Sequence, residues 1–255
     1  MPRADPVLIF DLDGTILSRN SFPYWVRALL TGGGRGGLHA RLSLSWQVQR
    51  LLLQRKLGGL GHDAFLREMQ RLWQVTEDST GKAAARLQSR LLRLVRANLR
   101  PVLKSVADLS VDSVLATAAA ADYAEPLARE LGFLNVLATP PAASTAQPCN
   151  RGQHKCDRVL AFLDNRGWED RPRIFFNDHM DDVPLMQVSH AVCWFGGRKD
   201  MAAASKAAPN ARFVPCRSLS AEEMRQMLAH LQLSLQTTHL AGSAPFAAAR
   251  ASTLS

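Results

Sequence analysis

Residues 7–10, with the sequence VLIF, form an unbroken run of aliphatic and aromatic side chains near the start of the chain. Such a run is typical of a strand buried on both faces of a parallel sheet. Two aspartates, Asp11 and Asp13, follow at the carboxyl end of this predicted strand. In open α/β sheets ligands bind outside the carboxyl ends of the strands. The run therefore predicts a parallel α/β fold with two carboxylates at its ligand-binding edge.

The DLDGT sequence at residues 11–15 also predicts a chemistry. Residues two positions apart in an extended segment share a side, so Asp11 and Asp13 need a counter-ion. Mg²⁺ is a natural one, because it commonly binds one or two carboxylates together with a substrate phosphate. A carboxylate can also attack phosphorus and form an aspartyl-phosphate. The alternative is a solvated Asp-Gly turn, which the preceding apolar strand disfavours.

The middle of the chain differs from its flanks in its residue pattern. Leu, Ala, Gln and Arg recur at helical spacing through residues 18–104, and two glycine-rich stretches interrupt them. The predicted helices cover residues 22–30, 38–57, 62–72 and 81–99. Beyond residue 111, strand candidates alternate with helical stretches, which indicates a doubly wound parallel sheet.

This pattern predicts a domain organisation. We expect an α/β core from residues 1–17 and 105–235, with an all-helical cap, residues 18–104, inserted into it. Residues 236–255 are small and polar with no periodicity, so we expect a disordered tail.

Four further polar residues stand where such a chemistry would need them. Thr117 ends a predicted strand, 113–117, and a hydroxyl there could hold a phosphoryl oxygen, although a simple helix cap is the alternative. Lys155 opens a predicted helix, and its ammonium could neutralise a nucleophile and a phosphate unless it is solvated. The predicted strand 174–177 presents Asp178 and, four residues later, Asp182.

The DLDGT sequence, the strand end at Thr117, Lys155 and the segment with Asp178 and Asp182 form four motifs. Together they resemble those of the haloacid dehalogenase (HAD) superfamily of phosphohydrolases. The resemblance covers roughly residues 7–195. The sequences ADYAEPLARELGF, CNRGQHK and FFNDHMDDVPLM are similar to the subgroup that includes phosphoserine and histidinol-phosphate phosphatases, subfamily IB. In that subgroup a helical cap of the C1 type enters just after the first motif, and the core is Rossmann-like.

The resemblance implies a role for each motif residue. Asp11 would be the nucleophile, and Asp13 the general acid and base that also offers Mg²⁺ its backbone carbonyl. Thr117 and Lys155 would bind the substrate phosphate. Asp178 would be a metal ligand. Asp182, preferred over its neighbour Asp181, would contact Lys155 or a metal-bound water.

The resemblance therefore implies an Mg²⁺-dependent phosphoric monoester hydrolase acting on a small phosphorylated metabolite. Phosphoserine phosphatases of this type carry a Glu nine residues after the nucleophile, and this chain has Asn20 there. Phosphoserine is thus disfavoured, while histidinol phosphate remains open. A catalytically silent binding protein of the same fold is the alternative of another class, but the chain retains all the motif acids and the lysine.

Charge is concentrated in the predicted cap. Residues 19–104 hold sixteen Lys and Arg against four Asp and Glu, a formal +12, while the whole chain carries +9. A lid of that sign would attract anionic phosphate esters, unless it is merely a solvated surface. The segment 38–57 is apolar on one face and Arg-rich on the other. We favour a helix buried against its neighbours, with contact to an anionic membrane and a phosphatidylglycerophosphate-type lipid substrate as the alternative.

The remaining composition excludes several classes. The four cysteines form no CxxC pair, so neither a zinc site nor a disulfide framework is indicated. The histidines form no HxxxH pair, and no nucleic-acid-binding motif accompanies the basic charge, so we expect no nucleic acid partner. With no apolar leader or spanning run, we expect a soluble, cytoplasmic protein. The sequence leaves the oligomeric state open.

Overall fold

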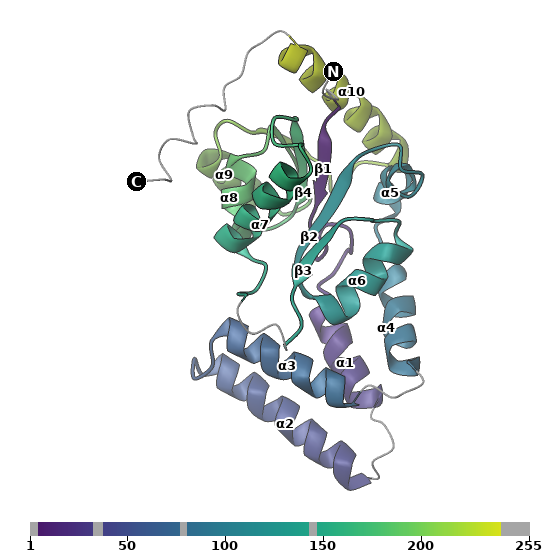
Figure 1. Cartoon of the computed structure of the whole chain (residues 1–255), viewed down its shortest axis with the longest axis vertical. Coiled ribbons are helices and arrows are strands. Elements are labelled where there is room, and N and C mark those ends of the chain that lie inside the picture. Colours follow the sequence, from purple (N-terminus) through teal and green to yellow (C-terminus); the bar gives the residue numbers. More distant parts are fainter. Residues whose placement is uncertain (1–4, 33–37, 77–80, 143–146, 241–255) are drawn as a thin grey trace.

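A computed structural model describes residues 5–32, 38–76, 81–142 and 147–240 of the 255-residue chain (Figure 1). Its centre is a six-stranded sheet in the order β3-β2-β1-β4-β5-β6, in which every neighbouring pair is parallel. The strands are β1 (Val7–Phe10), β2 (Ser113–Ala120), β3 (Val136–Thr139), β4 (Arg173–Asn177), β5 (Ala191–Trp194) and β6 (Arg212–Pro215). The predicted α/β fold class with a Rossmann-like parallel sheet is confirmed.

The strand order reverses beside β1. The chain runs outward from β1 through β2 to β3, and then returns to place β4 against the other side of β1. Ligands in open α/β sheets bind at the carboxyl ends of strands where the order reverses. The ends of β1 and β4 therefore define the edge at which a site is expected.

Helices cover both faces of the sheet because successive side chains of each strand point to opposite sides. Val7 and Ile9 of β1 pack with the helices on one face, and Leu8 and Phe10 with those on the other. The first face carries α7 (Gly152–Asn165), α8 (Val183–Gln187) and α9 (Arg198–Ala207). The second carries α5 (Arg100–Ala107), α6 (Ala121–Glu130) and α10 (Ala221–Leu240).

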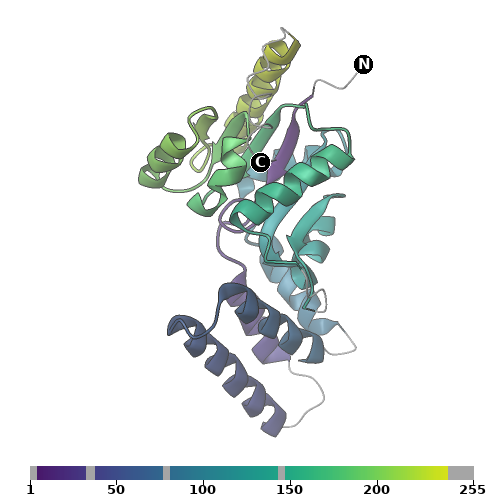
Figure 2. The same ribbon diagram turned by 60° about the vertical axis from the view of Figure 1, so that its left-hand side comes forward.

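Four more helices lie between β1 and β2 in sequence. They are α1 (Phe22–Gly32), α2 (Leu38–Lys56), α3 (His62–Thr76) and α4 (Lys82–Leu92). In both Figures 1 and 2, α2 and α3 lie at the end of the molecule opposite α10. The apolar core continues without a break from the sheet face into these helices, since Trp25 and Trp73 belong to the same buried cluster as Leu8.

The helix predicted over residues 81–99 is divided. Helix α4 ends at Leu92, and a short 3-10 helix, η1 (Ala97–Leu99), follows. Between them the backbone of Val95 forms an antiparallel bridge with Leu17, and the Arg96 N–H donates to the Ile16 carbonyl over 2.9 Å. The two connections between the sheet and the inserted helices thus pair with each other, which the helical periodicity did not indicate.

Two predicted boundaries fall inside helices. The expected cap boundary at Lys104 lies within α5. The expected tail begins at Gln236, but α10 continues to Leu240, because Leu231 and Leu235 pack on the apolar core. The disorder predicted for residues 236–240 is therefore wrong, and residues 241–255 lie outside the described residues.

None of the helices described is long and apolar enough to span a membrane.

Candidate active site

The turn after β1 brings the first two aspartates to the edge of the sheet. The backbone N–H of Asp11 donates to the Phe176 carbonyl over 2.9 Å, which fixes the end of β1 against β4. Gly14 has a φ of 75°, a conformation that favours glycine. A Cβ at Gly14 would lie 1.9 Å from Oδ2 of Asp178. Glycine is therefore required both for the turn and for the approach of the Asp178 carboxylate.

Lys155 joins the first and fourth motifs. Its Nζ lies 2.8 Å from Oδ1 of Asp11 and 2.7 Å from Oδ2 of Asp182, and its side chain is buried. Asp181, the neighbour that the sequence offered as an alternative, instead forms an exposed ion pair with Arg151. The structure thus brings Asp11, Lys155 and Asp182 together and points Asp181 elsewhere.

Asp13 is held by residues that the sequence analysis did not single out. Its Oδ1 accepts the backbone N–H of Ser21 over 2.7 Å, and its Oδ2 accepts the Ser21 hydroxyl over 3.0 Å. The Ser21 hydroxyl lies 2.8 Å from the hydroxyl of Tyr123 on α6. Burial raises the pKa of Tyr123 well above its ordinary value, so the phenol keeps its proton and can donate.

Arg96 is a second group that sequence reasoning missed. Its Nε donates to the Thr15 carbonyl over 2.9 Å and its Nη2 to the Gly14 carbonyl over 2.8 Å. The guanidinium also stacks over Phe195, with its carbon 5.3 Å from the ring centroid. Arg96, in the segment that leads from the inserted helices back to the sheet, therefore fixes the turn that carries Asp13.

The position of Thr117 differs from the one predicted. Strand β2 continues past it to Ala120, with a register shift against β3 between Ala116 and Ala120. The buried Thr117 hydroxyl accepts the Ala119 N–H over 3.1 Å. Since α6 begins at Ala121, Thr117 stands four residues before a helix rather than directly at its start. Among the described residues, no hydrogen bond joins Thr117 to Asp11 or Lys155.

Carboxylates outnumber ammonium groups in this site. Burial raises the pKa of Asp11 to about 7 against the opposing charge of Lys155, and it raises the pKa of Asp13 to about 6. Burial also raises the pKa of Asp178, and the charge of Asp178 further raises those of Asp11 and Asp13. For Lys155, burial alone would lower the pKa, but Asp11 and Asp182 raise it overall. The lysine therefore stays charged, and the carboxylates carry more negative charge than it can neutralise once they are ionised.

The family of the chain follows from its sequence as a whole. The model of the haloacid dehalogenase-like hydrolases matches residues 8–187, which contain every candidate site residue. This chain belongs to the haloacid dehalogenase-like hydrolases. The predicted superfamily is confirmed.

Solved structures of other proteins show the same fold. A protein of unknown function from Bordetella pertussis Tohama I has 20% identity and a TM-score of 0.63 over 84% of this chain and 99% of its own. A probable phosphoserine phosphatase from Vibrio cholerae has 12% identity and a TM-score of 0.61, covering 94% and 67%. A substrate-bound phosphoserine phosphatase has 10% identity and a TM-score of 0.54, covering 88% and 99%.

A search of curated proteins finds no significant match. The family match nevertheless supports a hydrolase, the broad class of enzyme expected from the motifs.

The site of this haloacid dehalogenase-like hydrolase offers donors for a hard cation. No group of three or more His, Cys, Asp or Glu side chains in the described part of the chain is arranged to hold a metal. The predicted set needs only two, the carboxylates of Asp11 and Asp178, with the backbone carbonyl of Asp13. Oδ1 of Asp182 is buried without a hydrogen-bond partner among the described residues, so a further donor could be accommodated there. Oxygen donors and excess negative charge fit a divalent cation such as Mg²⁺.

Proposed function

We propose that this chain is an Mg²⁺-dependent phosphoric monoester hydrolase that acts through an aspartyl-phosphate on Asp11. The observation that carries the proposal is the contact of the Asp11 carboxylate with a buried lysine, Lys155, at the reversal of the strand order, where the charge of Asp178 also acts on Asp11. Such placement supplies a nucleophile held by a fixed positive charge at the ligand edge of the sheet.

The first half of the proposed reaction uses Asp11 and Asp13. Lys155 engages Oδ1 of Asp11, and within the described residues no hydrogen bond engages Oδ2. A carboxylate oxygen of Asp11 attacks phosphorus, the bond from phosphorus to the ester oxygen breaks, and Asp13 gives its proton to the departing alkoxide. A pKa of about 6 suits this task, because an acid near the working pH can both give and take a proton.

In the second half, Asp13 acts as the base. Its carboxylate takes a proton from the water that attacks phosphorus, the bond between Asp11 and phosphorus breaks, and both aspartates return to their starting state. Lys155 neutralises the charge that moves between Asp11 and the phosphoryl oxygens. When bound by Asp11, Asp178 and the Asp13 carbonyl, Mg²⁺ supplies further positive charge there. Asp182 holds Lys155, and its Oδ1, which has no hydrogen-bond partner among the described residues, would be able to accept a hydrogen bond from a water bound to the cation. Thr117 remains the proposed second phosphate binder.

The proposed substrate is a small phosphorylated metabolite of the histidinol phosphate kind. Asn20 uses its side-chain oxygen to accept the Phe22 N–H over 2.8 Å, so it serves the start of α1. An amide in that role offers no carboxylate to a substrate amine, so phosphoserine stays disfavoured. The formal +12 of residues 19–104 favours anionic substrates.

A second candidate is hydrolysis of a phosphatidylglycerophosphate-type lipid. It is favoured by one observation, the exposed apolar side chains of α2, which include Trp46 and Leu53.

The test is phosphate release from a panel of monoesters, with Mg²⁺ and with EDTA. The panel contains histidinol phosphate, phosphoserine, sugar phosphates, nucleotides and phosphatidylglycerophosphate. We expect Mg²⁺-dependent turnover that Asp11→Asn abolishes and Asp181→Asn retains, because Asp181 is an exposed carboxylate of the fourth motif outside the Lys155 contacts. Turnover by Asp11→Asn at the wild-type rate would reject the nucleophile, and no turnover of any ester would favour the silent binding protein.

A further inference from the structure

Helix α2 carries apolar side chains on two opposite faces. Leu44 and Val48 are buried against the other inserted helices. Four other residues, which we call the outer stripe, are exposed: Leu42 by 58%, Trp46 by 61%, Leu53 by 56% and Leu57 by 75%. The Leu57 N–H still donates to the Leu53 carbonyl, so Leu57 continues the helical turn.

The outer stripe is narrow. At about 100° per residue, its members fall within an arc of about 60°, on the side of α2 opposite Leu44 and Val48. Of the nine large apolar side chains exposed among the described residues, four belong to the outer stripe, and a fifth, Leu52, lies outside its arc on the same helix. Such gathering marks an interaction surface, because scattered exposed apolar side chains are ordinary while contiguous ones are not.

The charges around the outer stripe indicate its partner. Helix α2 contains no Asp or Glu, and its basic residues are His39, Arg41, Arg50, Arg55 and Lys56. By the same helical geometry, Arg50 borders one edge of the stripe and Lys56 borders the other. The Arg50 guanidinium carbon lies 5.7 Å from the centroid of the Trp46 ring. Tryptophan, leucine and flanking cations are the composition of helices that lie at the surface of anionic membranes.

A second copy of the chain fits less well. Pairing two outer stripes would bring together two inserted segments of formal charge +12, which repel each other. An anionic surface instead complements that charge.

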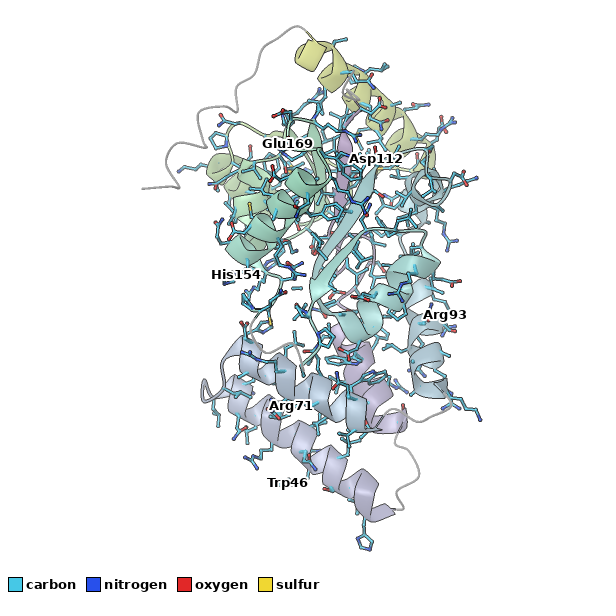
Figure 3. The ribbon with its side chains drawn as sticks, in the orientation of Figure 1. Trp46, Arg71, Arg93, Asp112, His154 and Glu169 are labelled. Atoms are coloured by element: carbon cyan, nitrogen blue, oxygen red, sulfur yellow. The ribbon has the colours of Figure 1, made fainter. Side chains whose placement is uncertain are left out.

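The position of α2 leaves the outer stripe accessible to a flat surface. Figures 1 and 2 both show α2 on the outside of the molecule, at the end opposite α10, and Figure 3 places Trp46 on this helix. A bilayer could thus contact α2 without meeting the sheet. Since no described helix can span a membrane, the contact would be peripheral.

We propose that the outer stripe of α2 docks on the surface of an anionic lipid bilayer. Leu42, Trp46, Leu53 and Leu57 enter the boundary between headgroups and acyl chains, while Arg50 and Lys56 meet the lipid phosphates. This contact is independent of the proposed hydrolysis, so either can fail without the other.

The experiment is flotation of the full-length protein with vesicles of phosphatidylglycerol and phosphatidylcholine, compared with vesicles of phosphatidylcholine alone. We expect binding to the anionic vesicles that weakens in high salt, and little binding to the neutral ones. Leu53→Glu should reduce binding about tenfold or more, because a charge replaces an inserted apolar side chain. Leu233→Glu is the matched control, since Leu233 is 63% exposed on α10 and should tolerate the change.

Circular dichroism of both variants establishes that they are folded before binding is compared. Failure of the wild type to float, or flotation of Leu53→Glu equal to that of the wild type, would overturn the proposal. Equal flotation with neutral vesicles would contradict the proposed preference for anionic lipid. A wild-type dimer that Leu53→Glu converts to a monomer, without vesicle binding, would assign the stripe to a second copy instead.

Discussion

The charged side chains are buried and paired at the edge of the sheet, but they are exposed on the outer face of α2. At the sheet edge a single buried lysine, Lys155, lies between Asp11 and Asp182 and forms one short ion pair with each of them. On α2 the side chains of Arg50, Arg55 and Lys56 are exposed, and the helix contains no Asp or Glu to pair with them. Buried charges act as individuals, because removing one leaves its partner desolvated and unpaired, whereas exposed charges act collectively and weakly. Single substitutions should therefore have sharp effects at the first region and graded effects at the second.

The largest expected effect is that of Lys155→Met. We expect kcat/KM to fall about 10³-fold, because the charge on the nucleophile and the phosphoryl oxygens loses its fixed partner. The free energy of unfolding should fall by about 3 kcal/mol at pH 8, since two buried carboxylates are left without their cation. Steady-state kinetics and urea denaturation measure the two effects.

The control for Lys155→Met is Arg151→Met. Arg151 pairs with Asp181 at side-chain exposures of 45% and 38%, so its loss should change stability by less than about 0.5 kcal/mol. Equal stability losses in the two variants would erase the contrast between buried and exposed pairs.

The buried carboxylates at the sheet edge should make both stability and Mg²⁺ affinity depend on pH. The raised pKa values of Asp11 and Asp13, about 7 and about 6, mean that the folded state holds protons that the unfolded state has lost. The metal-free protein should thus lose stability as pH rises from about 4 to about 7. A divalent cation replaces the Asp11 proton, so Mg²⁺ affinity should rise about tenfold between pH 6 and pH 8.

Thermal unfolding with and without Mg²⁺ at the two pH values measures this dependence. The shift in Tm should be larger at pH 8. The same shift at both values, or one that persists in Asp178→Asn, would contradict the proposed ligands.

A smaller effect is expected from Tyr123→Phe, which removes only the hydroxyl that contacts Ser21. If Ser21 and Tyr123 position Asp13 as the acid, esters with poor leaving groups should suffer most, by about fivefold in kcat, because they need protonation. Hydrolysis of p-nitrophenyl phosphate, whose leaving group needs little protonation, should change by less than about twofold. A uniform loss for both kinds of ester would assign Tyr123 a structural role only.

The smallest effect at the active site is expected from Trp46→Ala on α2. Trp46 is 61% exposed on the outer face, so kcat/KM for a water-soluble ester should stay within about twofold of the wild type. A large loss with a soluble substrate would show that the outer stripe and the sheet edge are coupled.

The fold was predictable where burial is uniform. Strands β1 and β4 are buried throughout, β1 as an unbroken apolar run and β4 with the apolar centre Ile174–Phe176, and both were predicted with acids after their ends. Strand β6 was missed because its half-exposed sequence RFVP has no clear alternation and includes an arginine and a proline. The end of β2 was missed because alanines 118–120 have little strand preference.

The candidate site was predictable where local motifs specify it. Asp11, Lys155 and Asp182 lie in recognisable segments, and they meet in the structure. Ser21, Arg96 and Tyr123 lie in no motif of their own. Their contacts with the first motif depend on how the two connections pair and how α6 packs, which are tertiary properties. The proximity of Ser21 to Tyr123, 102 residues apart, has no signal in a single sequence. The second apolar face of α2 was missed for a different reason. Apolar residues on opposite sides of a helix contribute in opposite directions to its amphipathic pattern, so the sequence shows no clear second face.

The central claim is that Asp11 becomes phosphorylated during turnover. It is tested most directly by mixing the enzyme with a good monoester substrate and Mg²⁺, quenching within the first turnover, and reducing the acyl phosphate with borohydride. Peptide mass spectrometry then identifies the reduced residue. The account predicts homoserine at position 11, absent without substrate and absent from Asp11→Asn. Reduction at another residue, or none while phosphate is released in the same mixture, would contradict it.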